Sequence, residues 1–388
     1  MRIVEIREKA IRQKRTVRNA VGNFSDLTTS IVAVITDVVR NGRPVIGYAF
    51  NSVGRHACGL PMRERFIPRL LEAPEEDVTL DPKAFDPEKV LETMIGGEKM
   101  GGDAERSIPV GAIECAVWDA VGKIADEPVY KLIADHYRGG EYDKKVFCYI
   151  GGGWYTRDGG IPELIAEMQS HLDTGYTLLK TKVGGLPIDQ DKARVEAIIE
   201  LVGGDASRVA VDANGGIGDD RRPGYAEAFG PLGLRWFEEP AHPIDFYANA
   251  QFVAAYKSPV ATGENLFSIQ DVRNLLRYGG MRPGVDVLQT DIPQCYGIAM
   301  AARIQKMIGE FGWSSRSVVP HGGHMLSLNA AAGLGLGMCE AYRGGFGPFS
   351  GYADDLKVED GWLTVGDWAG MGFERQNVLY GMMKEVAE

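Results

Sequence analysis

The chain has 388 residues, of which 45% are hydrophobic and 24% are charged, and its formal net charge is −11. This composition is typical of a globular protein long enough for two domains or one large barrel with additions. The acidic balance without a basic stripe argues against nucleic acid as a partner. No apolar run approaches the roughly 20 residues of a membrane helix, and no segment resembles a signal peptide, which argues against a membrane location.

The cysteines indicate the compartment. There are five of them, scattered along the chain without a CxxC pair. An odd, dispersed set of this kind is typical of reduced thiols packed in the interior. We therefore expect a cytoplasmic protein without disulfides.

Residues 1–140 predict an α+β unit that caps the rest of the protein. Strands are expected in MRIVEIREKAI, SIVAVITDVV and PVIGYAFNS, and the turn Asn41-Gly42-Arg43 indicates a hairpin between the last two. Helical periodicity follows in RERFIPRLLEA, in DPEKVLETMI and over the long stretch VGAIECAVWDAVGKIADEPVYKLIADH.

Residues 141–355 alternate between short apolar runs and helical patterns. The apolar runs are VFCYIGGG, TLLKTKVG, RVAVDANG, LRWFEEP, VATGEN, VDVLQTD, SVVPHGG and GMCEAYRG. Helical patterns such as PELIAEMQSHLDTG lie between them, and the Gly- and Pro-rich segment 214–232 gives the weakest helix. This alternation predicts a parallel sheet with helical crossovers, and seven or eight units in about 200 residues favour a closed α/β barrel over an open sheet.

The tail, residues 356–388, has its own pattern. A hairpin is expected at Glu359-Asp360-Gly361, followed by a helix in QNVLYGMMKEVAE. We expect this segment to return to the N-terminal cap.

A chemically active side chain ends almost every apolar run of the barrel. One βα unit occupies roughly the length between neighbouring members of this series, so the series recurs at the C-terminal ends of successive strands. These ends converge on one mouth of a barrel, where active sites lie. Helix capping explains one or two such residues but not seven in succession. The residues are Lys182, Asp212, Glu238, Glu264, Asp291, His321 and Glu340, at spacings of 30, 26, 26, 27, 30 and 19.

Two lysines in TLLKTKVG pose an electrostatic problem. Lys180 and Lys182 lie on the same face of a strand because side chains alternate with a period of two. We expect Lys180 to stay charged and to bind a substrate carboxylate. Its charge, with that of a nearby cation, is expected to lower the pKa of Lys182, which makes Lys182 a candidate base.

Three carboxylates predict a metal site. Asp212, Glu238 and Glu264 end adjacent strands and would repel one another without a cation. Mg²⁺ prefers oxygen ligands of this kind, and no Cys/His cluster favours zinc. Alternation alone allows Glu239 in place of Glu238, but Glu238 keeps the even spacing.

The neighbours of these carboxylates have predicted supporting roles. Glu239 and Asn265 are expected to orient the metal ligands, while Asn214 is expected to orient them or to contact the substrate. Asp291 is expected to hold one ring nitrogen of His321 and to raise the imidazole pKa. His324, three residues further on, is interpreted as structural.

Together these motifs resemble the mandelate racemase-like group of the enolase superfamily. The resemblance covers nearly the whole chain and implies a modified (β/α)7β barrel with an α+β cap, one Mg²⁺ per subunit on the three carboxylates, and a symmetric homo-oligomer. It also implies removal of the proton α to a carboxylate, with Lys182 on one face of the substrate and the Asp291–His321 pair on the other. The motifs are Lys180-Thr181-Lys182, Val211-Asp212-Ala213-Asn214, Glu238-Glu239-Pro240, Gly263-Glu264-Asn265, Asp291 and Pro320-His321-Gly322-Gly323.

Within that group, the cap and its flanking stretches resemble those of the tartrate dehydratases. The matching stretches are VRNAVGNF, GYAFNSVGRH, GGEKMGGDAERS, TGENLFS and NLLRYGGMRP. This resemblance implies that Asn19, Asn51 and Lys99 reach a small anionic diacid.

The expected reaction is dehydration of a 2,3-dihydroxy acid by syn or anti elimination. Lys182 takes the α proton, His321 protonates the departing β-hydroxyl, and Glu340, if protonated, hydrogen-bonds the substrate carboxylate. The enol product becomes a 2-oxo acid, which for D-tartrate is oxaloacetate. Three alternatives stay open: dehydration of a longer aldonate or aldarate, racemisation with Lys182 and His321 as two bases, and a barrel that binds sugar acids without turnover.

Overall fold

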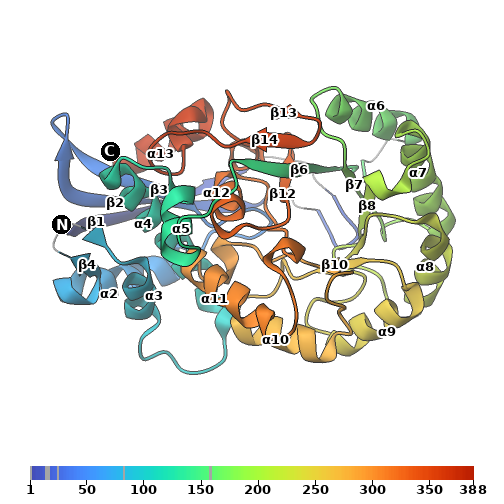
Figure 1. Cartoon of the computed structure of the whole chain (residues 1–388), viewed down its shortest axis with the longest axis horizontal. Coiled ribbons are helices and arrows are strands. Elements are labelled where there is room, and N and C mark those ends of the chain that lie inside the picture. Colours follow the sequence, from blue (N-terminus) through green and yellow to red (C-terminus); the bar gives the residue numbers. More distant parts are fainter. Residues whose placement is uncertain (1, 14–17, 24–25, 82–83, 157–159) are drawn as a thin grey trace.

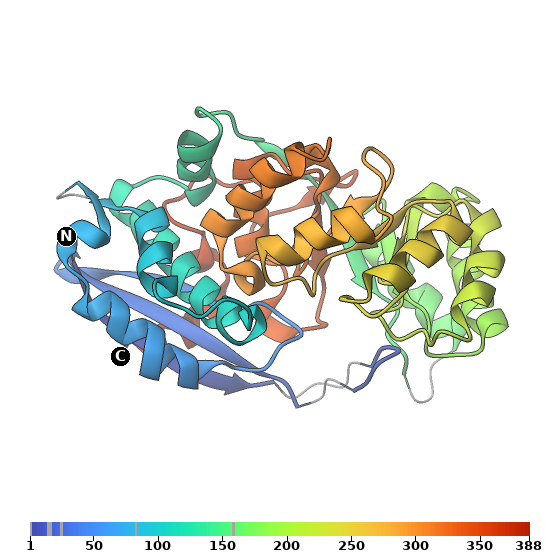
Figure 2. The same cartoon turned by 90° about the horizontal axis from the view of Figure 1, so that it is seen from below.

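The structure is a computed structural model that describes residues 2–13, 18–23, 26–81, 84–156 and 160–388. It contains a cap built around the N-terminal strands and a barrel ringed by helices (Figure 1). Both termini lie on the cap side of the molecule, at the left of the view. Seen from below, residues 18–23 lie beside the barrel (Figure 2), where the N–H of Tyr155 donates to the carbonyl of Arg18 at 2.9 Å. Residues of this segment therefore take part in the barrel mouth.

The cap begins with a three-stranded antiparallel sheet in the order β1-β2-β3. Asn41 and Gly42 have φ of 50° and 75°, as a tight hairpin requires, so the predicted turn is present. Helix α4 (Asp103–Ala125) packs on this sheet. The approach is so close that a Cβ on Gly47 would lie 2.1 Å from the carbonyl oxygen of Ala116. The strands are β1 (Ile3–Arg12), β2 (Thr28–Arg40) and β3 (Arg43–Phe50).

The helical part of the cap differs from the sequence prediction in one respect. The long helical stretch is divided into α4 and α5 (Val129–Tyr137), because Asp126 ends α4 in the left-handed region with φ of 61° and Pro128 lacks the N–H that a continuous helix needs. The remaining elements of the cap are α1 (Gly59–Pro61), the π-helical η1 (Met62–Phe66), α2 (Ile67–Glu72), η2 (Glu75–Asp77), β4 (Thr79–Asp81), β5 (Ala84–Phe85) and α3 (Pro87–Ile95).

The barrel strands pair in parallel with their neighbours in the sequence, and the last strand pairs with the first. One strand position is reduced to a single bridge between Leu288 and Val318. The described strands are β6 (Lys145–Gly152), β7 (Leu179–Lys182), β8 (Val209–Asp212), β9 (Phe237–Glu238), β10 (Val260–Thr262), β11 (Val287–Leu288) and β12 (Cys339–Tyr342).

Helices connect these strands and form the outer ring in Figure 1. Eight strand positions and seven helices in the described residues confirm the predicted (β/α)7β barrel. The helices are α6 (Ile161–Leu172), α7 (Ile188–Leu201), α8 (Arg222–Phe229), α9 (Phe246–Tyr256), α10 (Ile269–Tyr278), α11 (Ile298–Gly309) and α12 (Met325–Leu334). Short 3₁₀ turns are η3 (Ala206–Arg208), η4 (Gly230–Leu232), η5 (Pro293–Cys295), η6 (Ser315–Ser317), η7 (Gly347–Phe349) and η8 (Phe373–Arg375).

The period of two along each strand separates an apolar layer from a polar one inside the barrel. Leu178, Ala210 and Trp236 belong to a buried apolar cluster inside the barrel, on the side away from the C-terminal ends of the strands. Two residues further along the same strands come Lys180, Asp212 and Glu238, all buried. The apolar layer therefore fills the barrel interior, and the charged layer lies next to it, nearer the C-terminal ends of the strands.

The tail contacts both parts of the molecule. A hairpin of β13 (Val358–Glu359) and β14 (Trp362–Thr364) pairs antiparallel with the first residues of β6. Helix α13 (Asn377–Ala387) then returns to the cap, where the Tyr380 ring meets the edge of Tyr48 at 6.0 Å. Among the described residues no helix is both long and apolar enough to cross a membrane. All five cysteines are free, and four of them are buried.

Candidate active site

The strand ends and the cap enclose a cavity of about 210 Å³. A larger and more open hollow of about 850 Å³ lies between the cap sheet and α13, and none of the strand-end residues lines it. The chemistry therefore belongs to the smaller cavity. Its lining residues are Asn19, Val21, Val53, Gly54, Arg55, Trp154, Lys182, Asn214, Glu239, Glu264, Asn265, Gln294, His321, Tyr342 and Phe346.

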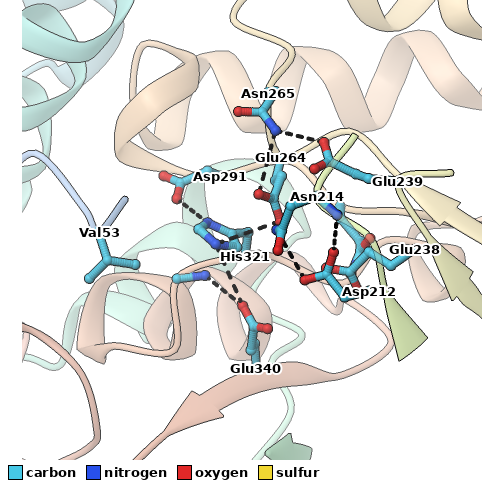
Figure 3. A network of polar contacts seen from close by, with 12 residues as sticks. Val53, Asp212, Asn214, Glu238, Glu239, Glu264, Asn265, Asp291, His321 and Glu340 are labelled. Atoms are coloured by element: carbon cyan, nitrogen blue, oxygen red, sulfur yellow. Dashed lines mark hydrogen bonds and ion pairs between the residues drawn. The ribbon is translucent and has the colours of Figure 1, made fainter. Parts of the chain in front are cut away.

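Asp212, Glu238 and Glu264 converge on one point (Figure 3), and Glu264 is also part of the cavity lining. Each offers an oxygen, and these atoms lie within 4.8 Å of one another. Burial, more than any neighbouring charge, raises the pKa of Glu238 to about 8. Within the described residues, Oε2 of Glu264 has no hydrogen-bond partner. Closely spaced carboxylates with an unsatisfied oxygen fit a hard divalent cation, which prefers oxygen ligands.

Amide side chains hold Asp212 in place. The backbone N–H of Asn214 donates to Asp212 Oδ1 at 2.8 Å, and the Asn214 side chain donates to Oδ2 at 3.2 Å. Asn19 of the N-terminal segment donates to Asn214 Oδ1 at 2.9 Å. Both amides also line the cavity. The cap therefore reaches the metal site through Asn19, beside the space available to a substrate.

Glu239 and Asn265 form a second supporting pair. Asn265 Nδ2 donates to Glu239 Oε1 at 2.6 Å and to Glu264 Oε1 at 3.4 Å. Strand alternation would turn Glu239 away from Glu238, but a left-handed φ of 43° at Glu239 breaks that alternation. Both glutamates of the pair consequently lie at the barrel mouth, Glu238 at the metal site and Glu239 in the cavity wall.

Lys180 and Lys182 share one face of β7, as the alternation predicts, but their surroundings differ. Lys180 is 1% exposed, and its Nζ lies 2.5 Å from Glu238 and 2.6 Å from Glu340. Burial lowers its pKa, but these carboxylates outweigh burial and raise it well above the usual value. Lys180 does not line the cavity. The structure thus gives it structural partners in place of the expected substrate carboxylate.

Lys182 lies in the cavity wall. Its Nζ donates to Asp212 Oδ2 at 2.5 Å and lies 4.6 Å from the ring centre of Trp154. The carboxylate that holds this ammonium is also a member of the metal triad. Asp212 therefore belongs to both the candidate base and the candidate metal site, and a cation held by the triad would lie beside Lys182.

Glu340 does not have the protonated form that the sequence interpretation invoked. Although burial opposes ionisation, the charges of Lys180 and His321 lower its pKa to about 2. Its Oε2 accepts the backbone N–H of Gly322 at 3.0 Å. As a carboxylate it has no proton to donate to a substrate, and it lies outside the cavity lining. It holds Lys180 and the loop that carries His321.

His321 and Asp291 form the predicted pair. His321 Nδ1 donates to Asp291 Oδ2 at 2.7 Å, and Nε2 faces Glu264 at 3.7 Å. Burial lowers the imidazole pKa, but Glu264 and Asp291 outweigh it and raise the pKa to about 10. His321 lines the cavity together with Lys182, so a protonated imidazole and a candidate base face the same space.

A hydrogen-bond chain continues behind Asp291. Ser52 Oγ donates to Asp291 Oδ2 at 2.6 Å and lies 2.9 Å from His324 Nε2, while Ser327 N–H donates to His324 Nδ1 at 3.2 Å. Because Nδ1 accepts and the Ser52 proton points to Asp291, His324 is neutral with its proton on Nε2. Burial lowers its pKa to about 4. His324 also caps α12, which agrees with a structural role.

Residues 163–377 match the model of the enolase C-terminal domain-like family, which is more than half of the chain. The chain belongs to the enolase superfamily. It is 28% identical over 270 residues to an arabinonate dehydratase from Saccharolobus solfataricus, covering 68% of this chain and 69% of the relative. It is 31% identical over 280 residues to a 3,6-anhydro-alpha-L-galactonate cycloisomerase from Streptomyces coelicolor, covering 71% and 72%. A racemase structure from Streptomyces coelicolor with bound magnesium superposes with a TM-score of 0.79, at 25% identity and coverage of 97% and 99%.

Several cavity residues of this superfamily member are absent from the sequence prediction. Trp154 and Phe346 meet edge to face at 5.7 Å, and with Tyr342 they form an aromatic wall beside Lys182. Trp154 lies two residues after the end of β6, and the search for polar residues at strand ends does not select a tryptophan. Arg55 lies in a loop and Gln294 in the short 3₁₀ turn η5, where no periodic signal marks them.

Two residues predicted to contact substrate lie away from the cavity. Asn51 is buried, where it accepts the N–H of Ser30 at 2.8 Å and donates to the carbonyl of His56 at 2.9 Å. Lys99 is exposed and is not part of the cavity lining. Asn51 therefore supports the cap loop that follows it, and Lys99 has no contact with the site in this structure.

The buried histidine behind Asp291 gives a pH-dependent stability. The native state keeps His324 neutral down to about pH 4, whereas the unfolded chain protonates it below about 6.5. Its contribution is present above pH 6.5 and is lost as the pH falls toward 4, by roughly 2–3 kcal/mol. We expect His324→Asn, which retains a capping acceptor, to reduce the change in urea midpoint between pH 7 and pH 5. The exposed His136→Asn is the control, and an identical pH dependence in both variants would contradict the prediction.

Proposed function

We propose that this protein is a Mg²⁺-dependent hydro-lyase that dehydrates hydroxy acids, and that D-tartrate, converted to oxaloacetate, is its best candidate substrate. One observation carries the proposal: Lys182 and the Asp291-held His321 line the same cavity as metal-triad carboxylate Glu264. The similarity to an arabinonate dehydratase supports a reaction on a sugar acid. The tartrate assignment is supported by the cap sequence.

Asp212, Glu238 and Glu264 would hold one Mg²⁺ per subunit, which acts as a Lewis acid toward the negative charge that develops on the substrate carboxylate. Lys182 Nζ takes the proton from the α carbon, and the electron pair of the broken C–H bond forms the carbon–carbon double bond. The bond to the β-hydroxyl breaks as this double bond forms, and its electron pair leaves with the oxygen. His321 gives its proton to this leaving group, so that water departs and the enol tautomerises to a 2-oxo acid.

A substrate panel tests the proposed function. The purified protein with Mg²⁺ is incubated with the three tartrate stereoisomers, arabinonate, xylonate, galactarate and glucarate, and 2-oxo acid formation is measured. We expect turnover of D-tartrate. Turnover of six-carbon diacids without tartrate would support the longer-chain alternative, and absence of any 2-oxo acid would contradict the dehydratase.

A racemase is the second candidate, favoured by the superposed racemase structure. In that reaction Lys182 and His321 would act as bases on opposite faces of the α carbon. Incorporation of solvent deuterium at that carbon with inversion, and without 2-oxo acid, would establish it. Binding of sugar acids without exchange or elimination would instead indicate a non-catalytic barrel.

A single substitution is expected to separate the role of Lys182, which removes a proton, from that of His321, which donates one. His321→Asn removes the proton donor but leaves Lys182 and the metal triad unchanged. We expect 2-oxo acid formation to fall by roughly 10²–10⁴-fold, which is the usual contribution of a general acid. Exchange of the α proton with solvent should persist, measured by NMR in deuterium oxide. Loss of exchange in parallel with elimination would contradict separate roles for the two residues.

We further propose that the protein is cytoplasmic and forms a symmetric homo-oligomer. This assembly is an expectation from the superfamily resemblance. Analytical ultracentrifugation in the presence of Mg²⁺ tests it directly, and a monomer at micromolar concentration would contradict it.

A further inference from the structure

A third cation in the cavity has no part in the reaction described above. The cavity is lined by Lys182, His321 and Arg55, and only the first two exchange protons with the substrate in the proposed mechanism. Arg55 lies in the cap loop after β3 and is half-buried. A guanidinium stays protonated at all relevant pH values, so its contribution is a fixed positive charge.

Two neutral amides hold the guanidinium. Arg55 Nε donates to Gln294 Oε1 at 3.2 Å, and Nη2 donates to Asn265 Oδ1. The guanidinium also lies over the Phe267 ring, 5.0 Å from its centre. In the described part of the chain, no carboxylate forms an ion pair with Arg55. The side chains that bind it directly are therefore neutral, and donors beyond the two that bind the amides remain available.

The orientation of both amides is fixed from the opposite side. Gln294 Nε2 donates to Asp291 Oδ2 and to the Val53 carbonyl, each at 3.0 Å. Asn265 Nδ2 donates to Glu239 and Glu264. Because carboxylate and carbonyl oxygens accept hydrogen bonds and cannot donate them, each amide presents its NH2 group to these oxygens and its own oxygen to Arg55. The guanidinium is consequently positioned by Asn265, which binds the triad residue Glu264, and by Gln294, which binds Asp291.

The loop that carries Arg55 is also fixed. Ser52 adopts a left-handed φ of 65° and is hydrogen-bonded to Asp291 and His324. Asn51 binds the loop at His56. Val53 and Gly54 then line the cavity directly before Arg55. A preorganised guanidinium loses little conformational entropy when it binds an anion, which favours its use in recognition.

We propose that Arg55 binds a second carboxylate of the substrate, remote from the metal-bound one, and thereby selects dicarboxylic hydroxy acids over aldonates. This inference rests on the proposed function and names its substrate class. A planar guanidinium and a carboxylate form charge-assisted, often bidentate, hydrogen bonds. The terminal hydroxymethyl group of an aldonate is neutral and offers no such partner. A monocarboxylic substrate would leave the Arg55 charge unpaired in the cavity.

The test compares D-tartrate with threonate and erythronate, which replace one tartrate carboxylate with a hydroxymethyl group. We expect Arg55→Gln to raise the KM for D-tartrate roughly 10–100-fold, the range for one charge-assisted contact, and to change values for the four-carbon aldonates much less. Arg55→Lys retains the charge and should lose less of the preference. Arg277→Gln is the matched control, because Arg277 also lies over a phenylalanine ring, Phe311, outside the cavity.

Ligand binding measured by calorimetry does not depend on turnover, so it tests this inference independently of the proposed function. Dissociation constants of D-tartrate and threonate are measured with Mg²⁺ for the wild type, both Arg55 variants and the control, alongside their thermal unfolding. A tartrate preference that Arg55→Gln removes supports the inference even if no 2-oxo acid forms. Equal losses for both ligands in folded Arg55→Gln and Arg55→Lys would show that Arg55 only supports Asn265 and Gln294, and would overturn it. An unchanged preference in both variants would overturn it as well.

Discussion

Replacing Lys182 with alanine is expected to abolish exchange of the substrate α proton with solvent and to lower turnover by 10³-fold or more. A positioned general base contributes roughly 10²–10⁴-fold, and no other side chain lining the cavity on that side carries an amine. Exchange is measured by NMR in deuterium oxide, and turnover by 2-oxo acid formation. Lys192→Ala, which removes a partly exposed lysine of α7 paired with Glu196, is the control and should retain both activities.

Retained exchange in Lys182→Ala would show that another group removes the proton. His321 is then the remaining candidate, because it faces the same cavity. The double variant Lys182→Ala/His321→Asn separates these cases. Exchange that survives Lys182→Ala but disappears in the double variant would assign the proton removal to His321. The proposed roles of the two residues would then be exchanged or shared.

The barrel was predictable because its signal is periodic. Each βα unit repeats an apolar run, a strand-end polar residue and a helix, so the even spacing from Lys182 to His321 located the mouth without any tertiary information. The same regularity chose Glu238 over Glu239 for the metal triad. The division of the long cap helix was less evident from periodicity, since the apolar pattern continues through Pro128 although the backbone does not.

What the sequence could not provide were the contacts that cross between units. Alternation placed Lys180 and Lys182 together, but only the fold shows that Glu340 from β12 closes on Lys180. That ion pair explains why Lys180 is unavailable to a substrate and why Glu340 is ionised. Arg55 illustrates the same limit, because its position in the cavity depends on two amides more than 200 residues away in the sequence. Side-chain contacts between segments that are distant in the sequence leave no local sequence pattern from which they could be predicted.

Loss of the metal is expected to have an effect as large as loss of the base. Chelation with EDTA should abolish turnover, and added Mg²⁺ should restore it, because the divalent cation would offset the negative charge that develops on the substrate carboxylate. Mg²⁺ alone should also raise the Tm of the wild type. A ligand that binds only the native state stabilises it by about 2.7 kcal/mol at 100 times its Kd.

Glu264→Gln tests the metal site through Mg²⁺ binding, although it also removes the carboxylate that faces His321 Nε2 at 3.7 Å. It removes one charge of the triad while the amide stays nearly isosteric, and Glu264 Oε2 has no hydrogen-bond partner to lose among the described residues. We expect a much smaller rise in Tm with Mg²⁺ and a comparable loss of turnover at low Mg²⁺, with partial recovery at high Mg²⁺. Glu196→Gln on the exposed face of α7 is the control. A Mg²⁺-induced rise in Tm that is equal in wild type and Glu264→Gln would place the ion elsewhere, and the mechanism would then lose the group that makes the α proton acidic.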